Sequence, residues 1–255
     1  MTHRYTIGGV AFCVDELLPD LEMNGFADDE LRVRVLDDAA FRSLDAPRLR
    51  RVDGQEGLTG ATDPDSRTCW LPNVYESSVA RSWQLRHMAP VFSSVLGRLV
   101  LHAGAAVFGE SIIGFVAEGG TGKSTLAGFL SDRGYRAVAD DLLPIRIDPE
   151  PSAPAGGRLL PVGAICFLSR AAVDTVTVEP LTTMEALQSL IRNGFGDHGD
   201  RPTWSFQFDA YHRLAHLIPF FSLTIPDDLA ALPRVEDALV HLAERQRRVL
   251  DSGGG

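Results

Sequence analysis

The sequence has few cysteines, and their spacing excludes a disulfide framework and a cysteine-rich metal site. Among its 255 residues only Cys13, Cys69 and Cys166 are cysteines, and no two of them form a C-x-x-C pair. Each lies among apolar residues, so we expect reduced thiols in the core.

The sequence has fewer basic than acidic residues, and it has no long apolar run. The formal net charge of −10 argues against a nucleic-acid partner and against binding to an anionic membrane. No apolar run approaches the roughly 20 residues of a membrane-spanning helix. Near the start, the run Ile7–Val14 stops at Asp15, which is not the pattern of a signal peptide. These features predict a cytoplasmic protein without a nucleic-acid or membrane partner.

What remains is a composition typical of globular proteins, with 45% hydrophobic and 23% charged residues. Residues 1–97 read as a small β-rich accessory domain, a candidate for substrate recognition. In this region Tyr5–Val14 is predicted to be a strand, and Leu31–Leu36 alternates apolar and charged residues as a half-buried strand does. The stretches Asp53–Gly57 and Ala61–Asp65 are rich in turn residues.

A helix is predicted over Ser77–Leu96 from the spacing of its apolar residues. Its candidate core residues are Val79, Trp83, Leu85, Met88, Val91, Phe92 and Val95.

Residues 98–255 form the predicted second domain. Two strands, Leu99–Phe108 and Ser111–Val116, are separated by Gly109-Glu110, which predicts a hairpin. The stretch Pro149–Gly157 is rich in Pro, Ala and Gly and reads as a loop. A final helix is expected after Leu232.

The most informative stretch is Ala117-Glu118-Gly119-Gly120-Thr121-Gly122-Lys123-Ser124-Thr125. It follows the β-branched run before Val116 and precedes a run typical of a helix, which is the context that a phosphate-binding loop requires. Its glycines allow successive N–H groups to point at a phosphate, and the helix N-terminus adds unpaired donors. Lys123 would reach the outer phosphates of ATP, and the Ser124 hydroxyl would ligate Mg²⁺. The expected nucleotide contacts are Gly119, Gly120, Thr121, Gly122, Lys123, Ser124 and Thr125.

A pair of acids, Asp140-Asp141, ends the short predicted strand Tyr135–Ala139. Carboxylates at the carboxyl end of a strand in an α/β sheet face the nucleotide crevice. There they bind Mg²⁺ or accept the proton of the attacking hydroxyl.

The stretch from Leu101-His102-Ala103-Gly104 through the glycine-rich loop to Arg133–Asp141 resembles the catalytic domain of the bacterial HPr kinase/phosphorylase family. That family has a histidine on the strand before a β-hairpin, a G-x-G-K-S loop and an R-G-[HY]-x-x-V-A-D-D stretch. The resemblance implies an α/β fold: a P-loop kinase domain of the HPr kinase and phosphoenolpyruvate carboxykinase type, with a small β-rich N-terminal accessory domain.

The resemblance also implies roles for single residues. Lys123 would hold the transferred phosphate, Asp141 would be the base, and Asp140 beside it would bind Mg²⁺ together with Ser124. His102 matches the family's active-site histidine and would orient the aspartate. Which of the two aspartates is the base stays open.

One departure changes the expected acceptor. The region Gly163–Arg170 lacks the metal-binding glutamate that the bifunctional family places there. The chain is therefore more similar to shorter HPr-kinase-like proteins such as the lasso-peptide kinases, in which the acceptor would be a serine hydroxyl of a precursor peptide. The expected activity is that of a one-way, ATP- and Mg²⁺-dependent serine kinase acting on a peptide or protein. A homo-oligomer is compatible with the sequence.

Phosphoryl transfer also requires an arginine near the transferred group. The candidates are Arg192, Arg201 and Arg213, which flank the loop-like segment Asn193–Trp204, and Arg201 ranks first. That segment is read either as a lid over the nucleotide or as a plain solvated loop.

Three alternatives remain. The i, i+4 pair His212 and His216 with Asp209 could ligate a metal, although surface or packing roles are the simpler reading. The chain could instead be a nucleotide-binding regulatory ATPase, but the acids and His102 favour a kinase because a regulator needs no proton acceptor. A kinase acting on an HPr-like protein is the third.

Overall fold

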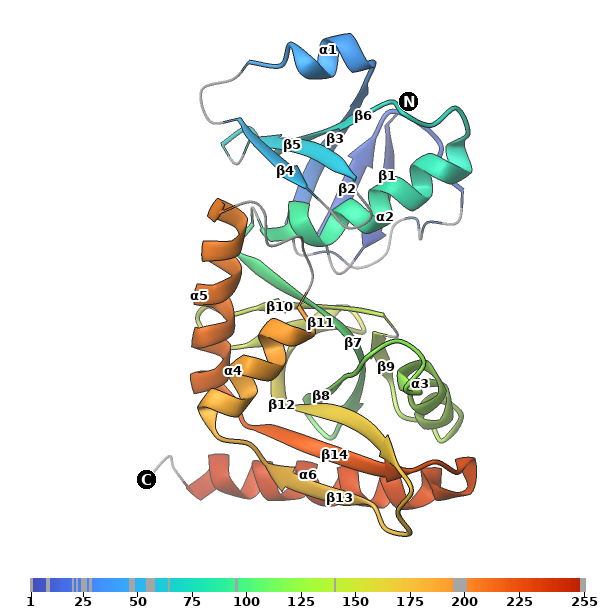
Figure 1. Cartoon of the computed structure of the whole chain (residues 1–255), viewed down its shortest axis with the longest axis vertical. Coiled ribbons are helices and arrows are strands. Elements are labelled where there is room, and N and C mark those ends of the chain that lie inside the picture. Colours follow the sequence, from blue (N-terminus) through green and yellow to red (C-terminus); the bar gives the residue numbers. More distant parts are fainter. Residues whose placement is uncertain are drawn as a thin grey trace. The chain divides into compact units, whose positions relative to one another are not determined.

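The chain folds into two compact units that contain a β-sheet each, so its fold class is mixed α/β. In the computed structural model, the first unit comprises Met1–Val100 with Phe195–Asp209, and the second comprises Leu101–Gly194 with Ala210–Gly255. Figure 1 labels their elements. The structure describes the chain except for residues 1, 8–9, 20, 22, 24–26, 28, 46–48, 54–57, 64, 95, 140, 195–200 and 253–255. It does not describe the side chains of residues 50, 52–53, 94, 201–204, 206 and 249–252.

The sheet of the first unit has six strands among the described residues, in the order β1-β2-β3-β6-β5-β4. The central pairs β2–β3 and β3–β6 are parallel, whereas the outer pairs are antiparallel. The strands are β1 (His3–Ile7), β2 (Val10–Val14), β3 (Asp29–Leu36), β4 (Arg50–Asp53), β5 (Thr59–Asp63) and β6 (Thr68–Pro72). The helices are α1 (Asp38–Arg42) and α2 (Ser78–Ser94).

Helix α2 packs on β5 through its apolar side. Leu85, Met88 and Phe92 are fully buried. At Gly60 of β5, an added Cβ would lie 2.9 Å from atoms of both Met88 and Phe92. The missing side chain therefore lets the helix approach the strand closely, and each buried Leu or Phe contributes roughly 1.5–3 kcal/mol.

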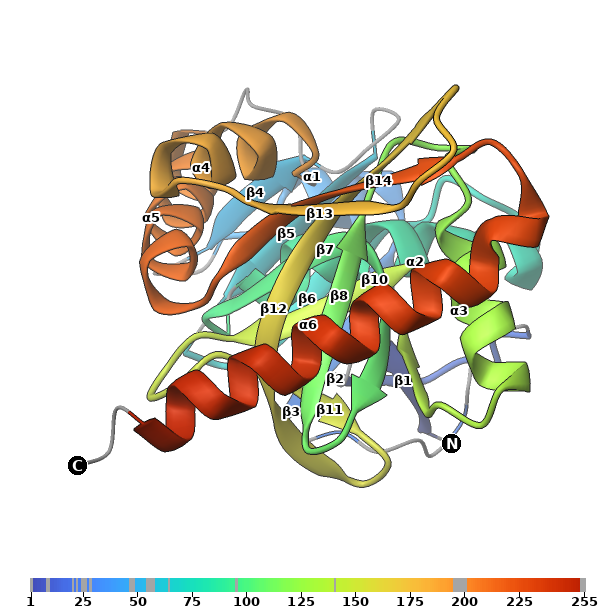
Figure 2. The same cartoon turned by 90° about the horizontal axis from the view of Figure 1, so that it is seen from below.

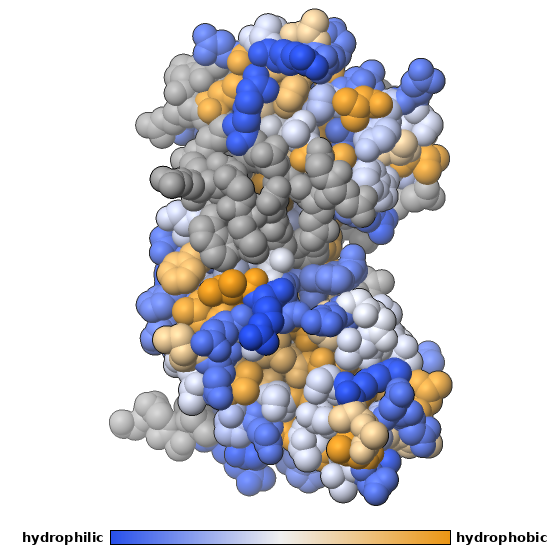
Figure 3. Space-filling view, in the orientation of Figure 1, coloured by the Kyte–Doolittle hydropathy of each residue, from blue (hydrophilic) through white to orange (hydrophobic). Residues whose placement is uncertain are grey.

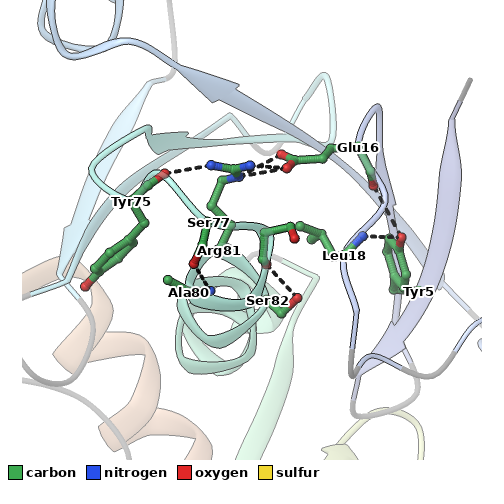
Figure 4. Close-up of polar contacts among 9 residues, drawn as sticks. Tyr5, Glu16, Leu18, Tyr75, Ser77, Ala80, Arg81 and Ser82 are labelled. Atoms are coloured by element: carbon green, nitrogen blue, oxygen red, sulfur yellow. Dashed lines mark hydrogen bonds and ion pairs between the residues drawn. The ribbon is translucent and has the colours of Figure 1, made fainter.

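An ion pair ties α2 to the segment after β2 (Figure 4). The Arg81 Nε donates to both carboxylate oxygens of Glu16, at 2.9 and 2.8 Å, and Nη1 donates to the Tyr75 carbonyl at 2.6 Å. In the same segment, the Leu18 N–H donates to the Tyr5 hydroxyl at 2.7 Å. Because Arg81 is largely buried, removal of one partner would leave an unpaired charge away from water.

Several sequence predictions for this unit are confirmed, and others are wrong. Leu31–Leu36 lies in β3 with Leu31 and Val33 buried. Tyr5–Val14, predicted as one strand, contains parts of two antiparallel strands, with Ile7 opposite Val10. The dipeptide Gly8-Gly9, which lies between the two strands in the sequence, is a common hairpin signal.

Two further predictions here need correction. Ala61–Asp63 lies in β5 rather than in a turn, because it pairs with strands on both sides. Val79 is 57% exposed rather than in the core, and Trp83 is half-buried. Val95 and residues 54–57 lie outside the described part of the chain.

The second unit is built on an eight-stranded sheet, counted over the described residues, in the order β11-β10-β7-β8-β12-β14-β13, with β9 paired to β7. The pairs β8–β12 and β12–β14 are parallel, whereas β7–β8, β7–β9 and β13–β14 are antiparallel. The strands are β7 (Arg98–Phe108), β8 (Ser111–Val116), β9 (Ala137–Ala139), β10 (Leu142–Arg146), β11 (Ser152–Ala155), β12 (Arg158–Ala171), β13 (Thr177–Pro180) and β14 (Phe220–Pro226). The helices are α3 (Lys123–Asp132), α4 (Thr183–Arg192), the 3₁₀ turn η2 (Leu229–Ala231) and α6 (Leu232–Ser252). Helix α5 (Arg201–Leu217) belongs to the first unit up to Asp209 and to the second unit from Ala210.

One face of this sheet is covered by α6, which crosses β8 and β12 (Figure 2). Leu239 and Val235 of α6 lie in one buried cluster with Phe115 of β8, Cys166 of β12 and Leu126 of α3. The strand that precedes the glycine-rich loop and the helix that follows it are thus anchored in the same core.

Several sequence predictions for this unit are confirmed, and others are wrong. The β7–β8 hairpin, the start of α3 at Lys123 and the final helix are confirmed. Pro149–Gly157, predicted as a loop, contains β11, because residues 152–155 pair with β12. Within Asn193–Trp204, residues 195–200 lie outside the described part, and Arg201–Trp204 begins α5 rather than continuing a loop.

No helix in the described part of the chain is both long and apolar enough to span a membrane. On the face drawn in Figure 3, hydrophobic and hydrophilic residues are interspersed over both units.

The three cysteines are free thiols, and burial raises the pKa of Cys69 and of Cys166 to about 12. Because only the thiolate reacts, and a raised pKa confines the thiolate to high pH, we expect Cys69 and Cys166 to resist a disulfide reagent at pH 8 in the native protein. Half-buried Cys13 should react first. Counting released thiolate before and after unfolding, in the native sequence and in Cys13→Ser, checks this. Fast release of more than one equivalent from the folded protein would contradict it.

Candidate active site

Residues from the strands β7, β8 and β12 meet at one edge of the second sheet, beside the carboxyl end of β8. Val116, the last residue of β8, pairs with Phe167 of the parallel strand β12. On its other side it pairs with Ala103 of the antiparallel strand β7. The residues after Val116 and the residues after Phe167 therefore lie at the same edge of the sheet. His102 lies at this edge too, because it comes directly before Ala103. In open α/β sheets such an edge is where ligands bind.

Residues 117–122 form the loop between β8 and α3. Gly120 and Gly122 have φ values of +80° and +106°, in the left-handed region that glycine enters without strain. The Thr121 hydroxyl donates to the Glu118 carbonyl at 2.8 Å, which closes the turn. Gly122 is the N-cap of α3 and offers no side chain to its first N–H groups. Those donors and the helix dipole favour an anion at this position.

Lys123 lies folded across this loop. It is buried, and its Nζ donates to the Ala117 carbonyl at 2.6 Å, with the Glu118 carbonyl at 3.5 Å. Burial lowers the pKa of Lys123, and the negative charge of Asp141 opposes that shift. Ser124 and Thr125 follow on the exposed side of the first turn of α3. The ammonium group and the helix N-terminus are thus held at one place.

Asp141 and His102 are in direct contact. The His102 Nε2 lies 2.8 Å from Asp141 Oδ1, and the Ala103 N–H donates to the Asp141 carbonyl at 3.0 Å. The second bond fixes the Asp141 backbone beside β7, so the carboxylate lies at the sheet edge. Asp141 is mostly exposed and His102 is half-buried, so a carboxylate reachable from solvent is oriented by an imidazole. Asp140 lies outside the described residues.

Arg170 lies against the other side of the loop, and sequence reasoning did not single it out. A Cβ built on Gly122 would lie 2.6 Å from Arg170 Nη2, so the guanidinium occupies the space that a side chain there would need. Its Nη1 donates to Asp227 Oδ1 at 3.0 Å. The available signal was its position at the end of the apolar run Ala164–Leu168, where a parallel strand reaches the crevice.

A cavity of about 610 Å³ lies on this side of the loop. Its walls come from the loop, the end of β12 and the end of α4, and its polar side chains include Arg170, Arg192, Ser189 and Asn193. Arg192 is placed by α4, which begins with a capping box: the Glu185 N–H donates to Thr182, and the Thr182 N–H donates to Glu185.

Arg213, another of the predicted arginines, does not line this cavity. Arg213 is exposed and binds Asp148 through both Nη atoms, with Nη1 at 3.0 Å from Oδ2. The hydrogen bond from Arg213 lowers the pKa of Asp148. The side chain of Arg201 lies outside the described part of the structure, so its role stays a prediction.

No group of three or more His, Cys, Asp or Glu side chains among the described residues could hold a metal ion by itself. The rings of His212 and His216 lie 4.5 Å apart on α5, but no third ligand from the described residues joins them. Mg²⁺ is different, because it takes only one or two protein ligands and completes its shell with water and phosphate oxygens. The exposed Ser124 hydroxyl and the exposed carboxylate of Asp141 are ligands of the kind that Mg²⁺ takes.

No protein-family model matches the chain, and no curated protein sequence matches it. A similar solved structure is the Hpr(Ser) kinase/phosphatase from Coxiella burnetii, with 16% sequence identity and a TM-score of 0.36. The match covers 60% of this chain and 95% of that one.

Gly122 and Gly119 give a matched test of the loop. Gly122→Ala places a Cβ at positive φ and against Arg170, so we expect it to lower the free energy of unfolding by about 1–2 kcal/mol. Gly119→Ala meets no atom within 4 Å and should change it by less than about 0.5 kcal/mol. Urea unfolding of both variants measures the difference. Equal stabilities would contradict the placement of Arg170.

Lys123 is the only lysine in the chain, so its ionisation can be measured alone. In protein made with [ε-¹³C]lysine, the single lysine Cε resonance should titrate below the pH at which free lysine does, because burial lowers the pKa of Lys123. Added tripolyphosphate should raise that pKa, since a bound anion favours the ammonium form. A pKa at or above the free value without added anion would contradict the buried position.

Proposed function

We propose that the second unit is a P-loop kinase domain that transfers the γ-phosphoryl group of ATP to a serine hydroxyl of a peptide or protein. The observation that carries the proposal is that three groups lie at one sheet edge. They are the glycine-rich loop with Lys123, the N-terminus of α3, and the His102–Asp141 pair. A phosphate site alone fits any nucleotide-binding protein, but a solvent-reachable carboxylate held by a histidine beside it fits a reaction that must remove a proton.

The reaction assigns a task to each residue. The loop N–H groups and Lys123 hold the phosphates and offset their charge. The serine oxygen attacks the γ-phosphorus, the bond to the oxygen bridging β and γ breaks, and ADP leaves. Asp141 accepts the hydroxyl proton, and His102 keeps the carboxylate turned to the acceptor. Mg²⁺, held by Ser124 and a carboxylate of the Asp140-Asp141 pair, would neutralise charge on the phosphates.

The acceptor that we propose is a serine-containing peptide, such as the precursor of a peptide natural product. The absence of a glutamate in Gly163–Arg170 supports a one-way kinase over a bifunctional one. With a net charge of −10, the protein would favour an acceptor that binds through apolar or basic residues. We assign recognition of that acceptor to residues 1–97, whose exposed apolar residues include Leu17, Val74 and Val79, and we place the protein in the cytoplasm.

Two substitutions separate binding from chemistry. Lys123→Ala should abolish phosphoryl transfer and weaken ATP binding in a protein that stays folded. Asp141→Asn should lower turnover by about 10²–10⁴-fold while ATP binding changes little, because it removes only the proton acceptor. Asp148→Asn replaces an exposed carboxylate that is paired with Arg213 and serves as the matched control.

The assay is the gain of one phosphate on a serine-containing peptide by mass spectrometry, with the Ser→Ala peptide and purified HPr in parallel. Full activity of folded Lys123→Ala or Asp141→Asn would overturn the proposed roles. ATP hydrolysis without peptide phosphorylation would identify a regulatory ATPase. Efficient phosphorylation of HPr would return the protein to the bifunctional family.

A further inference from the structure

The glycine-rich loop separates two chemically different sides of the sheet edge. In the strand order β7-β8-β12, β8 and its loop lie in the middle. On the β7 side lies the carboxylate of Asp141 with His102. On the β12 side lie the guanidinium of Arg170 and the cavity that it lines. An acid–base pair therefore lies on one side of the loop and a cation on the other.

The cavity on the β12 side carries positive charge in an acidic protein. Among the residues that the structure describes, the charged side chains in its wall are Arg170, Arg192 and Glu118, which together give +1. Its volume of about 610 Å³ lies within the roughly 300–1,000 Å³ of small-molecule sites. Phe167 and Leu168 add apolar surface to the same wall. A ligand with an anionic end and a flat, partly apolar end matches these walls.

The hydrogen bond from Arg170 leaves part of its guanidinium directed at the loop. Nη1 donates to Asp227, whereas Nη2 and Nε lie at the Gly122 end, 2.6 and 3.4 Å from the position of a Cβ built there. Asp227 follows β14, which pairs in parallel with β12, so the carboxylate is placed by the sheet itself. Among the described residues, Asp227 accepts the hydrogen bond of the Arg170 side chain. One edge of the guanidinium is thus fixed, and the other faces the end of the loop where α3 begins.

We infer that this cavity binds the nucleoside diphosphate end of the donor, and that Arg170, positioned by Asp227, contacts its terminal phosphate. The inference rests on the proposed function. In phosphoryl transfer the attacking and leaving oxygens lie on opposite sides of the phosphorus. With the proton acceptor Asp141 on the β7 side, the leaving diphosphate lies on the β12 side. Arg170 then stabilises the negative charge that develops on the leaving group.

Binding of MgADP tests this assignment, because MgADP is the leaving group. Loss of a charge-assisted hydrogen bond should weaken MgADP and MgATP binding alike, by about 10- to 100-fold, in Arg170→Ala. Arg213→Ala, which breaks an ion pair of the same kind with Asp148, is the matched control and should bind both as the original chain does. Arg170→Gln, which is closer in size, keeps the test valid if the alanine variant does not fold.

Asp227 acts only through Arg170, so its effect should disappear when Arg170 is absent. Asp227→Asn alone should weaken MgADP binding less than Arg170→Ala does. Combined with Arg170→Ala it should add nothing, a coupling that a general structural role would not produce.

The outcomes separate this inference from the proposed function. Unchanged MgADP affinity in folded Arg170→Ala would overturn the inference, and so would weakened MgATP binding with unchanged MgADP binding, which would place Arg170 at the γ-phosphate. Additive effects of the two substitutions would overturn the role of Asp227. If the original chain binds neither MgADP nor MgATP in calorimetry, the proposed function itself fails.

Discussion

The candidate site depends on the pairing of β8, which is antiparallel to β7 on one side and parallel to β12 on the other. This arrangement brings the start of β7 and the ends of β8 and β12 to the same edge. It decides that His102 and Arg170, which are far apart in the sequence, flank one glycine-rich loop. A shift of β8 by one residue against either neighbour would turn its side chains to the opposite face of the sheet. The burial of these side chains therefore fixes the register that the site requires.

The hydrophobic core fixes the loop at both of its ends. Phe115 of β8 and Leu126 of α3 belong to the same buried cluster as Leu239 of α6. Because the strand before the loop and the helix after it cannot move independently, the geometry of the loop is set before any ligand binds. Such preorganisation is what electrostatic stabilisation of a charged transition state requires. The positive φ values of Gly120 and Gly122 allow the short connection.

The charged side chains at this edge of the sheet are each held by a partner. The only lysine of the chain is buried in the loop, where its ammonium group is held by carbonyl oxygens. Arg170 is held by Asp227 and Asp141 contacts His102. Each of these charges thus has a partner that fixes its direction. Burial makes the hydrogen bond of Lys123 stronger than it would be in water.

The sequence by itself determined the local features. The β-branched run before the loop, the glycines and the lysine at the helix start are signals within a dozen neighbouring residues, and β8, the loop and α3 follow them. Local signals were less reliable where pairing partners decide the conformation. Residues 152–155 became β11 although they are rich in Ala and Pro, because β12 offers hydrogen bonds along them. Conversely, the break within Tyr5–Val14 was readable from Gly8-Gly9.

Only the tertiary structure decided which distant side chains share the site. The contact between His102 and Asp141 was suggested by resemblance, but its geometry arises from the pairing of β7 with β9. Arg170 and Asp227 could not be foreseen, because their contact depends on the parallel register of β12 and β14, two strands joined by a long segment of chain. The register of distant strands is set by the packing of whole faces rather than by neighbouring residues, and no pattern within one segment records it.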